Sequence, residues 1–226
     1  MISHQSDTKA LRQSIIDACL SMNQLGLNQG TSGNISARCG ERMLITPSGI
    51  AYETLTPEML LSLPLAGGLD VPFPGESQPA LRPSSEWRFH KALLQNHADM
   101  GFVVHAHPAY ATALAMIRKP IPASHYMIAA FGGDSLRVAD YAIFGSKTLA
   151  ENVVRASANR HGCLMANHGA LVLGETLARG LWRLGELEVL AKSYTLAQML
   201  GTPAILSAAE IEEALQAFAD YGLKDS

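Results

Sequence analysis

The segment "GFVVHAHPAYATALA", Gly101 to Ala115, joins an apolar run to an alanine-rich stretch, with two histidines between them. The apolar run predicts a β-strand over Phe102–His107, and the alanine-rich stretch predicts a helix from about Pro108 to Ile117. Side chains two residues apart in a strand project from the same face, so His105 and His107 can bind one metal ion together. A metal site needs a further ligand, which the rest of the chain must supply.

Strands and helices alternate on both sides of this segment. Short strands are expected over Ile35–Arg38, over Met43–Thr46 and near Leu136–Ala139, and "GCLMANHGALVLGE" predicts a hairpin with its turn around His168 and Gly169. Helices are expected over residues 8–25, after Pro83, over Ser146–Ala158, from about Leu177 and over Ala208–Ala219. We interpret this order as one three-layer α/β domain over residues 1–226, in which helices cover both faces of a central mixed or antiparallel sheet.

The composition is that of a globular protein and argues against several classes of partner. Of the 226 residues, 48% are hydrophobic and 16% are charged, and no apolar run reaches the roughly 18 residues that a membrane span requires. The net charge of −3, without a long block of Lys or Arg, argues against a nucleic-acid partner. The N-terminus is polar and lacks the apolar core of a signal peptide, so we expect a cytoplasmic protein.

The cysteines of the chain do not form a recognisable metal or disulfide pattern. Cys19, Cys39 and Cys163 are odd in number and far apart, which favours reduced thiols over a disulfide framework or a CxxC metal site. Any metal in this protein must therefore be held by histidines.

Three parts of the sequence stand out as candidate metal ligands: Glu86 in "PSSEW" at a predicted helix start, the pair His105 and His107, and His168 in a predicted turn. Each alone has an ordinary structural explanation, such as a hydrogen-bonded histidine or a glutamate that complements the helix dipole. Together, three imidazoles with an optional carboxylate are typical of a catalytic divalent metal, zinc above all. His125 stays open as a residue near the site or at an interface, and we assign the other histidines to the terminus, to helix packing or solvent, or to a loop: His4, His90, His97 and His161.

Two short segments have the chemistry of an anion site. "GTSGN", Gly30 to Asn34, and "TPSG", Thr46 to Gly49, combine glycines with hydroxyl and amide side chains, although each alone is also an ordinary turn. Backbone N–H groups and a helix N-terminus can bind phosphate without any lysine, and no nucleotide-binding glycine motif is present. A metal beside a carboxylate, with phosphate donors nearby, suits a reaction that builds negative charge next to a carbonyl, because a Lewis acid stabilises an enediolate.

Seven segments carry a resemblance to a known family. "GTSGNIS", "TPSGI", "PSSEW", "HAHP", "HYMIAAFGG", "YAIFGS" and "NHG" occur in the same order as the signature segments of the class II aldolase/adducin family. The resemblance runs from about residue 8 to the end, and Gly67–Leu81 is the main stretch without a counterpart. It implies a class II aldolase-like fold in a fourfold-symmetric homotetramer with active sites at subunit interfaces.

The resemblance also implies a role for individual residues. Zinc would be bound by His105, His107 and His168, with Glu86 ligating it when substrate is absent and acting as acid and base when substrate is present. Tyr126 would reach the active site of a neighbouring subunit. Further positions would bind the phosphate and the ketose, the last of them from a mobile tail: Thr31, Gly33, Asn34, Ser48, Gly49, Ser84, Ser85 and Tyr221.

The expected activity is therefore the reversible cleavage of a ketose 1-phosphate to dihydroxyacetone phosphate and an aldehyde. The aldehyde stays open between lactaldehyde, glycolaldehyde, acetaldehyde and a methylthio analogue, since a methyl or methylene contributes only ~1–3 kcal/mol of discrimination. Alternatives within the family are a sugar-phosphate 4-epimerase, which carries Asp in place of Glu86, a decarboxylase or a dehydratase. A non-catalytic adducin-like binding module would lack the metal ligands, and no lysine lies in a motif that would activate it for Schiff-base chemistry.

Overall fold

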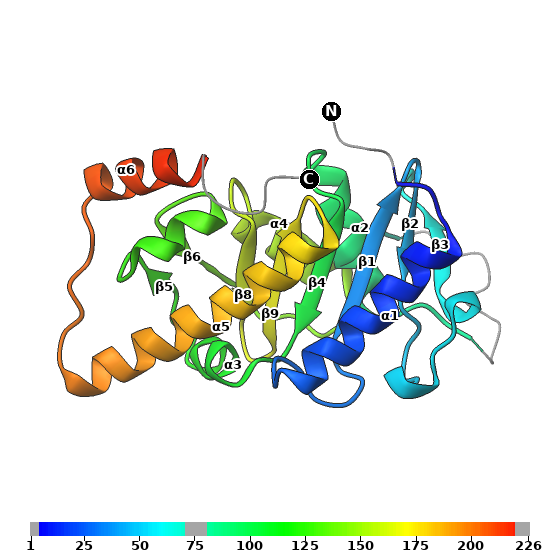
Figure 1. The fold of residues 1–226 in the computed structure, drawn as a ribbon, viewed down its shortest axis with the longest axis horizontal. Helices are drawn as coiled ribbons and strands as arrows, with labels where there is room; N and C mark the ends of the chain where they lie inside the picture. The colour runs from blue at the N-terminus through cyan, green and yellow to red at the C-terminus, as the bar shows by residue number, and fades with distance from the viewer. Residues whose placement is uncertain (1–4, 71–80, 220–226) are drawn as a thin grey trace.

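The computed structural model describes residues 5–70 and 81–219. In this part of the chain a seven-stranded sheet, with strand order β3-β2-β1-β4-β9-β8-β7, forms the centre of the molecule (Figure 1). Every neighbouring pair is antiparallel except β7 and β8, which run parallel, so the predicted mixed sheet is confirmed. The strands of this sheet are β1 (Asn34–Cys39), β2 (Arg42–Ile45), β3 (Leu61–Pro64), β4 (Phe102–Ala106), β7 (Val138–Ala139), β8 (Gly162–Met165) and β9 (Gly169–Gly174).

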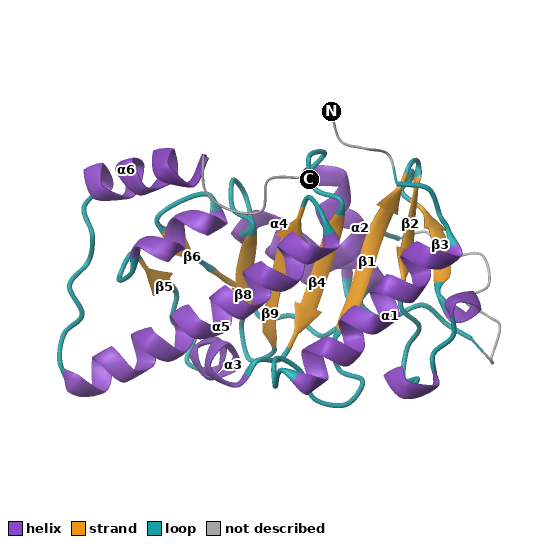
Figure 2. Ribbon diagram, in the orientation of Figure 1, coloured by secondary structure: helices purple, strands orange, loops and turns teal. Residues whose placement is uncertain are grey.

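Helices cover both faces of the sheet, which confirms the predicted three layers (Figure 2). Helices α1, α3 and α5 pack on one face, and α2 and α4 pack on the other. None of the helices in the described residues combines the length and apolar character needed to span a membrane. The α-helices are α1 (Lys9–Gln24), α2 (Trp87–Asn96), α3 (Ala109–Met116), α4 (Lys147–Ala156), α5 (Leu177–Leu200) and α6 (Ala208–Ala219).

Smaller elements lie at the edges of this framework. The predicted strand near Leu136–Ala139 is divided in two, because β6 pairs with β5 in a separate small sheet while β7 joins the main one. The remaining elements, which the sequence analysis did not anticipate apart from part of β6, are β5 (Ile121–Pro122), β6 (Ser135–Leu136) and the 3₁₀ helices η1 (Tyr52–Thr54), η2 (Pro57–Met59) and η3 (Tyr126–Phe131).

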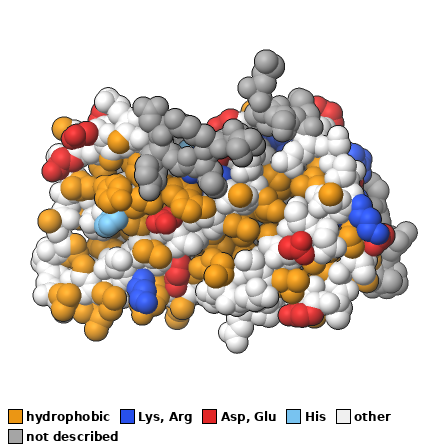
Figure 3. Space-filling view, in the orientation of Figure 1, with side chains coloured by type: hydrophobic (Ala, Val, Ile, Leu, Met, Phe, Trp, Pro, Cys, Tyr) orange, Lys and Arg blue, Asp and Glu red, His pale blue; other side chains and the backbone are white. Residues whose placement is uncertain are grey.

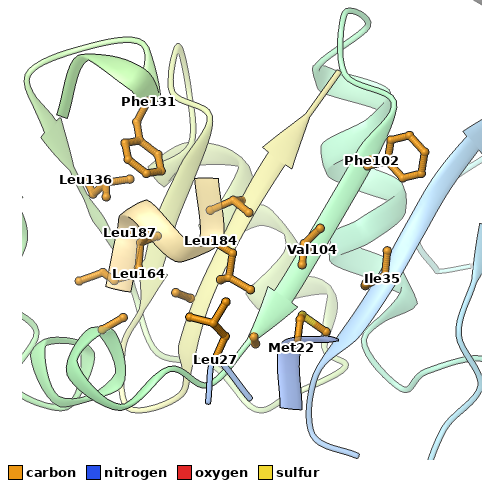
Figure 4. Packing of buried hydrophobic residues seen from close by; sticks show 14 of the residues in the cluster. Met22, Leu27, Ile35, Phe102, Val104, Phe131, Leu136, Leu164, Leu184 and Leu187 are labelled. Carbon is orange, nitrogen blue, oxygen red and sulfur yellow. The ribbon is translucent and has the colours of Figure 1, made fainter. Parts of the chain in front are cut away.

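Successive side chains of β4 project to opposite faces of the sheet, and this alternation decides on which face His105 lies. Val104 projects towards α5, where it packs with Leu184 and Leu187 (Figure 4). Val103 projects to the opposite face and packs with residues of α2 and α4. His105 shares the parity of Val103, so the strand period of two places this histidine on the α2 side of the sheet.

The predicted helix after Pro83 starts without a side-chain cap. The helix begins at Trp87, and Glu86 occupies the N-cap position without a capping hydrogen bond from its side chain. The Trp87 N–H instead donates to the Ser84 carbonyl at 3.0 Å. The Glu86 carboxylate is therefore free for contacts other than helix capping.

Candidate active site

Three histidines meet at one end of β4. His105 is the fourth residue of this strand and His107 follows its end, while His168 lies in the turn between β8 and β9. Because β4 pairs directly with β9, with Ala106 opposite Ala170, the turn residue lies beside the strand end. The three ring centroids are 4.9 to 5.0 Å apart, and one ring nitrogen from each lies within 4.8 Å of the others.

The hydrogen bonds of His105 show which of its nitrogens is available. Nδ1 lies 2.9 Å from the Ala170 carbonyl oxygen, which can only accept, so Nδ1 carries the proton and Nε2 carries a lone pair. That Nε2 lies 3.1 Å from His107 Nε2 and 3.2 Å from Glu86 Oε2. Metal–nitrogen bonds of about 2.0–2.1 Å in a tetrahedral site place two nitrogens about 3.3 Å apart. The converging acceptor atoms therefore fit a divalent cation.

Glu86 completes this cluster. Its side chain is buried, Oε2 accepts a hydrogen bond from Asn34 Nδ2 at 2.9 Å, and Oε1 lies 3.2 Å from His168 Nε2. Oε1 makes no hydrogen bond to any described residue, and a bound cation or substrate would supply the missing partner. Burial raises the pKa of the Glu86 carboxyl, but the electrostatic effect of His105, the polar contact and electrostatic effect of His168 and the hydrogen bond from Asn34 together outweigh it. The pKa therefore lies well below its usual range, and Glu86 is ionised.

The two candidate ligand histidines at the end of β4 are held in the neutral form that binds metals. The pKa of His107 is lowered to about 4, first by burial and then by the electrostatic effects of His105 and His168. The opposing effect of the Glu86 carboxylate is smaller. Burial also lowers the pKa of His105, against the opposing effect of Glu86. Neutral imidazole is the form that ligates a metal, so these residues do not have to lose protons at pH 7.

A pocket with a volume of about 460 Å³ opens beside the histidines, within the range of small-ligand sites. The structure brings the predicted phosphate and ketose residues together here: Thr31, Gly33, Asn34, Ser48, Gly49, Ser84 and Ser85 all line the pocket. No Lys or Arg is among its described lining residues, so an anion here would be bound by hydroxyl, amide and backbone N–H groups.

Tyr126 and Tyr221, the two predicted tyrosines of the site, are not among the described residues that line this pocket. Tyr126 lies in η3, 56% exposed, where it stacks on Phe218 at 6.3 Å between ring centroids and does not line the pocket of its own subunit. Tyr221 lies outside the described residues, as does most of the unmatched stretch Gly67–Leu81.

The segment from Thr31 to Asn34 packs closely against the metal-binding strand. A Cβ atom at Gly33 would lie 2.8 Å from the His105 carbonyl oxygen, so only glycine allows this approach. Asn28 holds the segment in place, because its Oδ1 accepts from Ser32 Oγ at 3.1 Å and from the His107 N–H at 3.4 Å. The segment predicted to bind an anion and the candidate ligand His107 are thus connected through one side chain.

Sequence reasoning overlooked several residues of the site. Tyr141, Ala142, Phe144 and Asn167 also line the pocket, and they lie in the segments "YAIFGS" and "NHG". His90 was assigned to packing or solvent, but it is fully buried and contacts Asn34. The spacing of Glu86 and His90, four residues apart at a helix start, is the signal that could have identified it.

Three imidazoles and a carboxylate beside a pocket for an anion, on a mixed sheet between two helical layers, define a metal-dependent enzyme of the class II aldolase type. The chain belongs to the class II aldolase and adducin family, since residues 13–195 match the Class II Aldolase and Adducin N-terminal domain.

Relatives match over almost the whole chain. An L-fuculose phosphate aldolase from Escherichia coli O6:H1 is 43% identical and covers 95% of this chain and 96% of its own. A 5-methylthioribulose-1-phosphate/5-deoxyribulose-1-phosphate aldolase from Rhodospirillum rubrum is 40% identical over 94% of this chain and 93% of its own. A solved L-fuculose 1-phosphate aldolase superposes with a TM-score of 0.86 at 36% identity, over 96% of this chain and 99% of its own. The chain is accordingly a class II aldolase, a metal-dependent lyase.

Proposed function

We propose that this enzyme reversibly cleaves a ketose 1-phosphate to dihydroxyacetone phosphate and an aldehyde, with zinc as its metal. The observation that carries the proposal is the convergence of the His105, His107 and His168 ring nitrogens beside the Glu86 carboxylate. A non-catalytic binding module would have no need of this arrangement. The relatives named above act on phosphorylated sugars, which is the substrate class we propose here.

The residues of the pocket divide the work of the reaction. The backbone and hydroxyl groups around Thr31, Ser48 and Ser84 would bind the phosphate. The three histidines would hold a zinc ion, which would supply a Lewis acid for the negative charge that develops on the ketose oxygens. When the bond between C3 and C4 breaks, its electron pair stays on C3 while the C4 hydroxyl loses its proton. Glu86, once it has taken up a proton from solvent, would deliver that proton to C3, and Tyr126 of the partner subunit would accept the proton of the hydroxyl while its own phenol proton passes to solvent.

Comparison with the relatives does not identify the aldehyde half of the substrate. Identities of 43% to a fuculose phosphate aldolase and 40% to a methylthioribulose phosphate aldolase are too close to choose between them. The two aldehydes differ mainly in apolar groups, which alter specificity by only ~1–3 kcal/mol per methyl or methylene. We propose that the stretch Gly67–Leu81 and the tail that contains Tyr221 determine this preference.

We also propose a homotetramer in the cytoplasm. Large hydrophobic side chains on α5 are exposed, among them Val189, Leu196, Met199 and Leu200. In Figure 3 hydrophobic side chains gather over α5 and towards α6. Apolar surfaces of this kind mark subunit interfaces. The three cysteines are unpaired, which is typical of proteins in a reducing compartment.

Chelation combined with a substrate panel tests this function. Dihydroxyacetone phosphate released from fuculose, deoxyribulose and methylthioribulose 1-phosphates is measured before and after treatment with a chelator, and again after zinc is added. We expect loss of cleavage on chelation, recovery with zinc and no inactivation by borohydride in the presence of substrate. Inactivation by borohydride would establish a Schiff base and exclude the proposed metal mechanism. Failure to cleave any ketose 1-phosphate would exclude the proposed substrate class.

A further inference from the structure

A chain of hydrogen bonds leads from Glu86 into the core on the α2 side of the sheet. Glu86 Oε2 lies 2.9 Å from Asn34 Nδ2, and Asn34 Oδ1 lies 2.5 Å from His90 Nε2. The other ring nitrogen of His90, Nδ1, lies 2.7 Å from Ser36 Oγ. All four side chains are buried, and His90 and Ser36 are completely inaccessible to solvent. Buried polar groups that hydrogen-bond to one another in this way are costly to disturb.

The hydrogen bonds from Ser36 to Glu86 can be donated in only one direction, because the Glu86 carboxylate can only accept. A carboxylate only accepts, so the Asn34 amide nitrogen must face Glu86 and the Asn34 oxygen must face His90. The Asn34 oxygen also only accepts, so His90 Nε2 must carry the proton and Nδ1 must accept from the Ser36 hydroxyl. Each group therefore donates towards Glu86: Ser36 to His90, His90 to Asn34 and Asn34 to Glu86.

Backbone geometry and packing hold the four groups in this order. Asn34 and Ser36 are two residues apart in β1 and face α2 together, while Glu86 and His90 are four residues apart at the start of α2. The His90 ring stacks on Phe89, with centroids 4.6 Å apart and an interplanar angle of 20°. Phe89 in turn contacts the His105 ring edge-on at 5.4 Å. The imidazole of His90 is thus held by both packing and hydrogen bonds.

We propose that His90 is a positioning residue for the aldolase reaction: its Nε2–H fixes the orientation of the Asn34 amide, and Asn34 in turn holds the Glu86 carboxylate. Without this N–H the Asn34 oxygen is a buried acceptor with no donor, and a rotated amide would point its oxygen at the carboxylate. Loss of orientation of Glu86 reduces proton transfer without removing the group itself. This inference rests on the proposed function, in which Glu86 protonates C3.

Two conservative variants separate the two nitrogens of His90. In His90→Gln the amide nitrogen can occupy the position of Nε2 and donate to Asn34, whereas in His90→Asn the amide reaches only the position of Nδ1, beside Ser36. With zinc content matched, we expect His90→Asn to lose kcat by about 10- to 100-fold, the range that misplacement of a reacting group produces, with KM unchanged. We expect His90→Gln to recover most of that loss. His97→Asn, at the end of the same helix and outside the site, is the matched control and should keep its kcat.

NMR of the metal-free protein tests the hydrogen bonds directly and does not depend on enzyme activity. The ¹⁵N chemical shifts of the His90 ring in the metal-free protein should show a protonated Nε2 and an unprotonated Nδ1. The side-chain N–H₂ signals of Asn34 should exchange with solvent slowly in the parent protein and in His90→Gln, and faster in His90→Asn. A ring protonated on Nδ1 would reverse the chain of hydrogen bonds and overturn the proposal.

The outcomes distinguish this inference from the proposed function. If the parent protein cleaves ketose 1-phosphates and His90→Asn retains the parental kcat, His90 does not position Glu86. If His90→Gln and His90→Asn lose kcat equally, with equal melting temperatures, the donation from Nε2 is not the reason for the loss. If the parent protein cleaves no ketose 1-phosphate, the proposed function fails, while the ring tautomer and Asn34 exchange still test the chain of hydrogen bonds.

Discussion

Individual atoms of Glu86 and His105 determine what the site can bind. His105 uses Nδ1 for the Ala170 carbonyl and presents Nε2 to the cluster. Glu86 uses Oε2 for Asn34 and keeps Oε1 without a hydrogen bond among the described residues. Since Glu86 does not cap α2 with its side chain, the carboxylate is available for proton transfer. These contacts support the proton-transfer role that we propose for Glu86.

Substitution of the two proposed proton-transfer groups should affect different steps. Glu86→Gln keeps the size and hydrogen bonding of the side chain but removes its basicity, so exchange of the C3 hydrogen of dihydroxyacetone phosphate with deuterated water should be lost. Tyr126→Phe should retain that exchange while cleavage of the full ketose phosphate falls. A general acid or base contributes about 10²–10⁴-fold, so both effects are measurable by NMR and by a coupled assay.

The division of roles has clear contrary results. Glu86→Gln protein that exchanges deuterium at the parental rate would assign the C3 proton to another group. Tyr126→Phe protein that loses exchange and cleavage equally would place this tyrosine at a step common to both. Zinc content and phosphate binding, measured for each variant, serve as controls for intact sites.

His90 should make the stability of the metal-free protein sensitive to acid. Burial lowers its pKa from the ordinary 6.5 to about 3, so between these values the unfolded chain binds a proton that the folded chain does not. The free energy of unfolding should therefore decrease as the pH falls through this window, by about 1.4 kcal/mol per pH unit for this one residue. His90→Gln should show a correspondingly shallower decline in urea unfolding between pH 6.5 and the onset of acid unfolding. Parallel pH curves for the two proteins would show that His90 is not the group responsible.

The turn between β8 and β9 is the element that positions the third histidine. Gly169 begins β9 directly after His168 and packs against β4. A Cβ atom at this position would lie 2.5 Å from His107 Cδ2 and 2.6 Å from the Ala106 carbonyl oxygen. Because one of these atoms belongs to the backbone, a movement of the His107 ring alone cannot relieve the contacts, and the backbone of the turn or of the strand must shift as well.

Gly169→Ala should therefore weaken metal binding more than its small size suggests. We expect zinc affinity to fall about 10- to 100-fold, the range seen when groups that orient metal ligands are changed, as measured by competition with a chromophoric chelator. Gly185→Ala in α5 is the matched control, since a Cβ there meets no atom within 4 Å. That control should bind zinc normally and gain up to about 1 kcal/mol of stability from helix propensity. Unchanged zinc affinity in Gly169→Ala would show that the turn tolerates the methyl group.

For the molecule as a whole, assembly determines whether Tyr126 can act. The residue is exposed on η3 and does not line the pocket of its own subunit, so a catalytic role requires a second chain. Light scattering should give a mass about four times that of one chain. A fully active monomer would remove Tyr126 from any neighbouring site.

Co-expression of two inactive variants tests the shared site directly. If each site takes Glu86 from one subunit and Tyr126 from the next, mixed tetramers of Glu86→Gln and Tyr126→Phe chains contain some sites with both parental residues. At equal expression the two kinds of chain mix at random around the symmetric ring, so about one site in four combines both parental residues. About a quarter of the parental activity should therefore return. Without exchange of residues between subunits, no site would regain both groups and the activity would stay at the level of the separate variants.

Local sequence pattern was sufficient for the parts of the site that lie on one element. The strand period of two placed His105 and His107 on the same face, and the start of α2 placed Glu86 at a helix N-terminus, as the structure has them. The hairpin around His168 and the layered fold also followed from alternating strands and helices. The segments of the family resemblance supplied seven of the residues that line the pocket.

Only the folded chain could show how these parts meet. His168 joins His105 because β4 pairs with β9, a contact between residues more than sixty positions apart, and pairing of this kind depends on the whole sheet. The same holds for His90, which sequence pattern assigned to packing or solvent. Its spacing from Glu86 is local, but its role depends on Asn34 and Ser36 from a strand that pairs with β4. Helix and strand periods specify which way a side chain points from its own element, whereas hydrogen-bond partners and the direction of donation arise only when distant elements pack together.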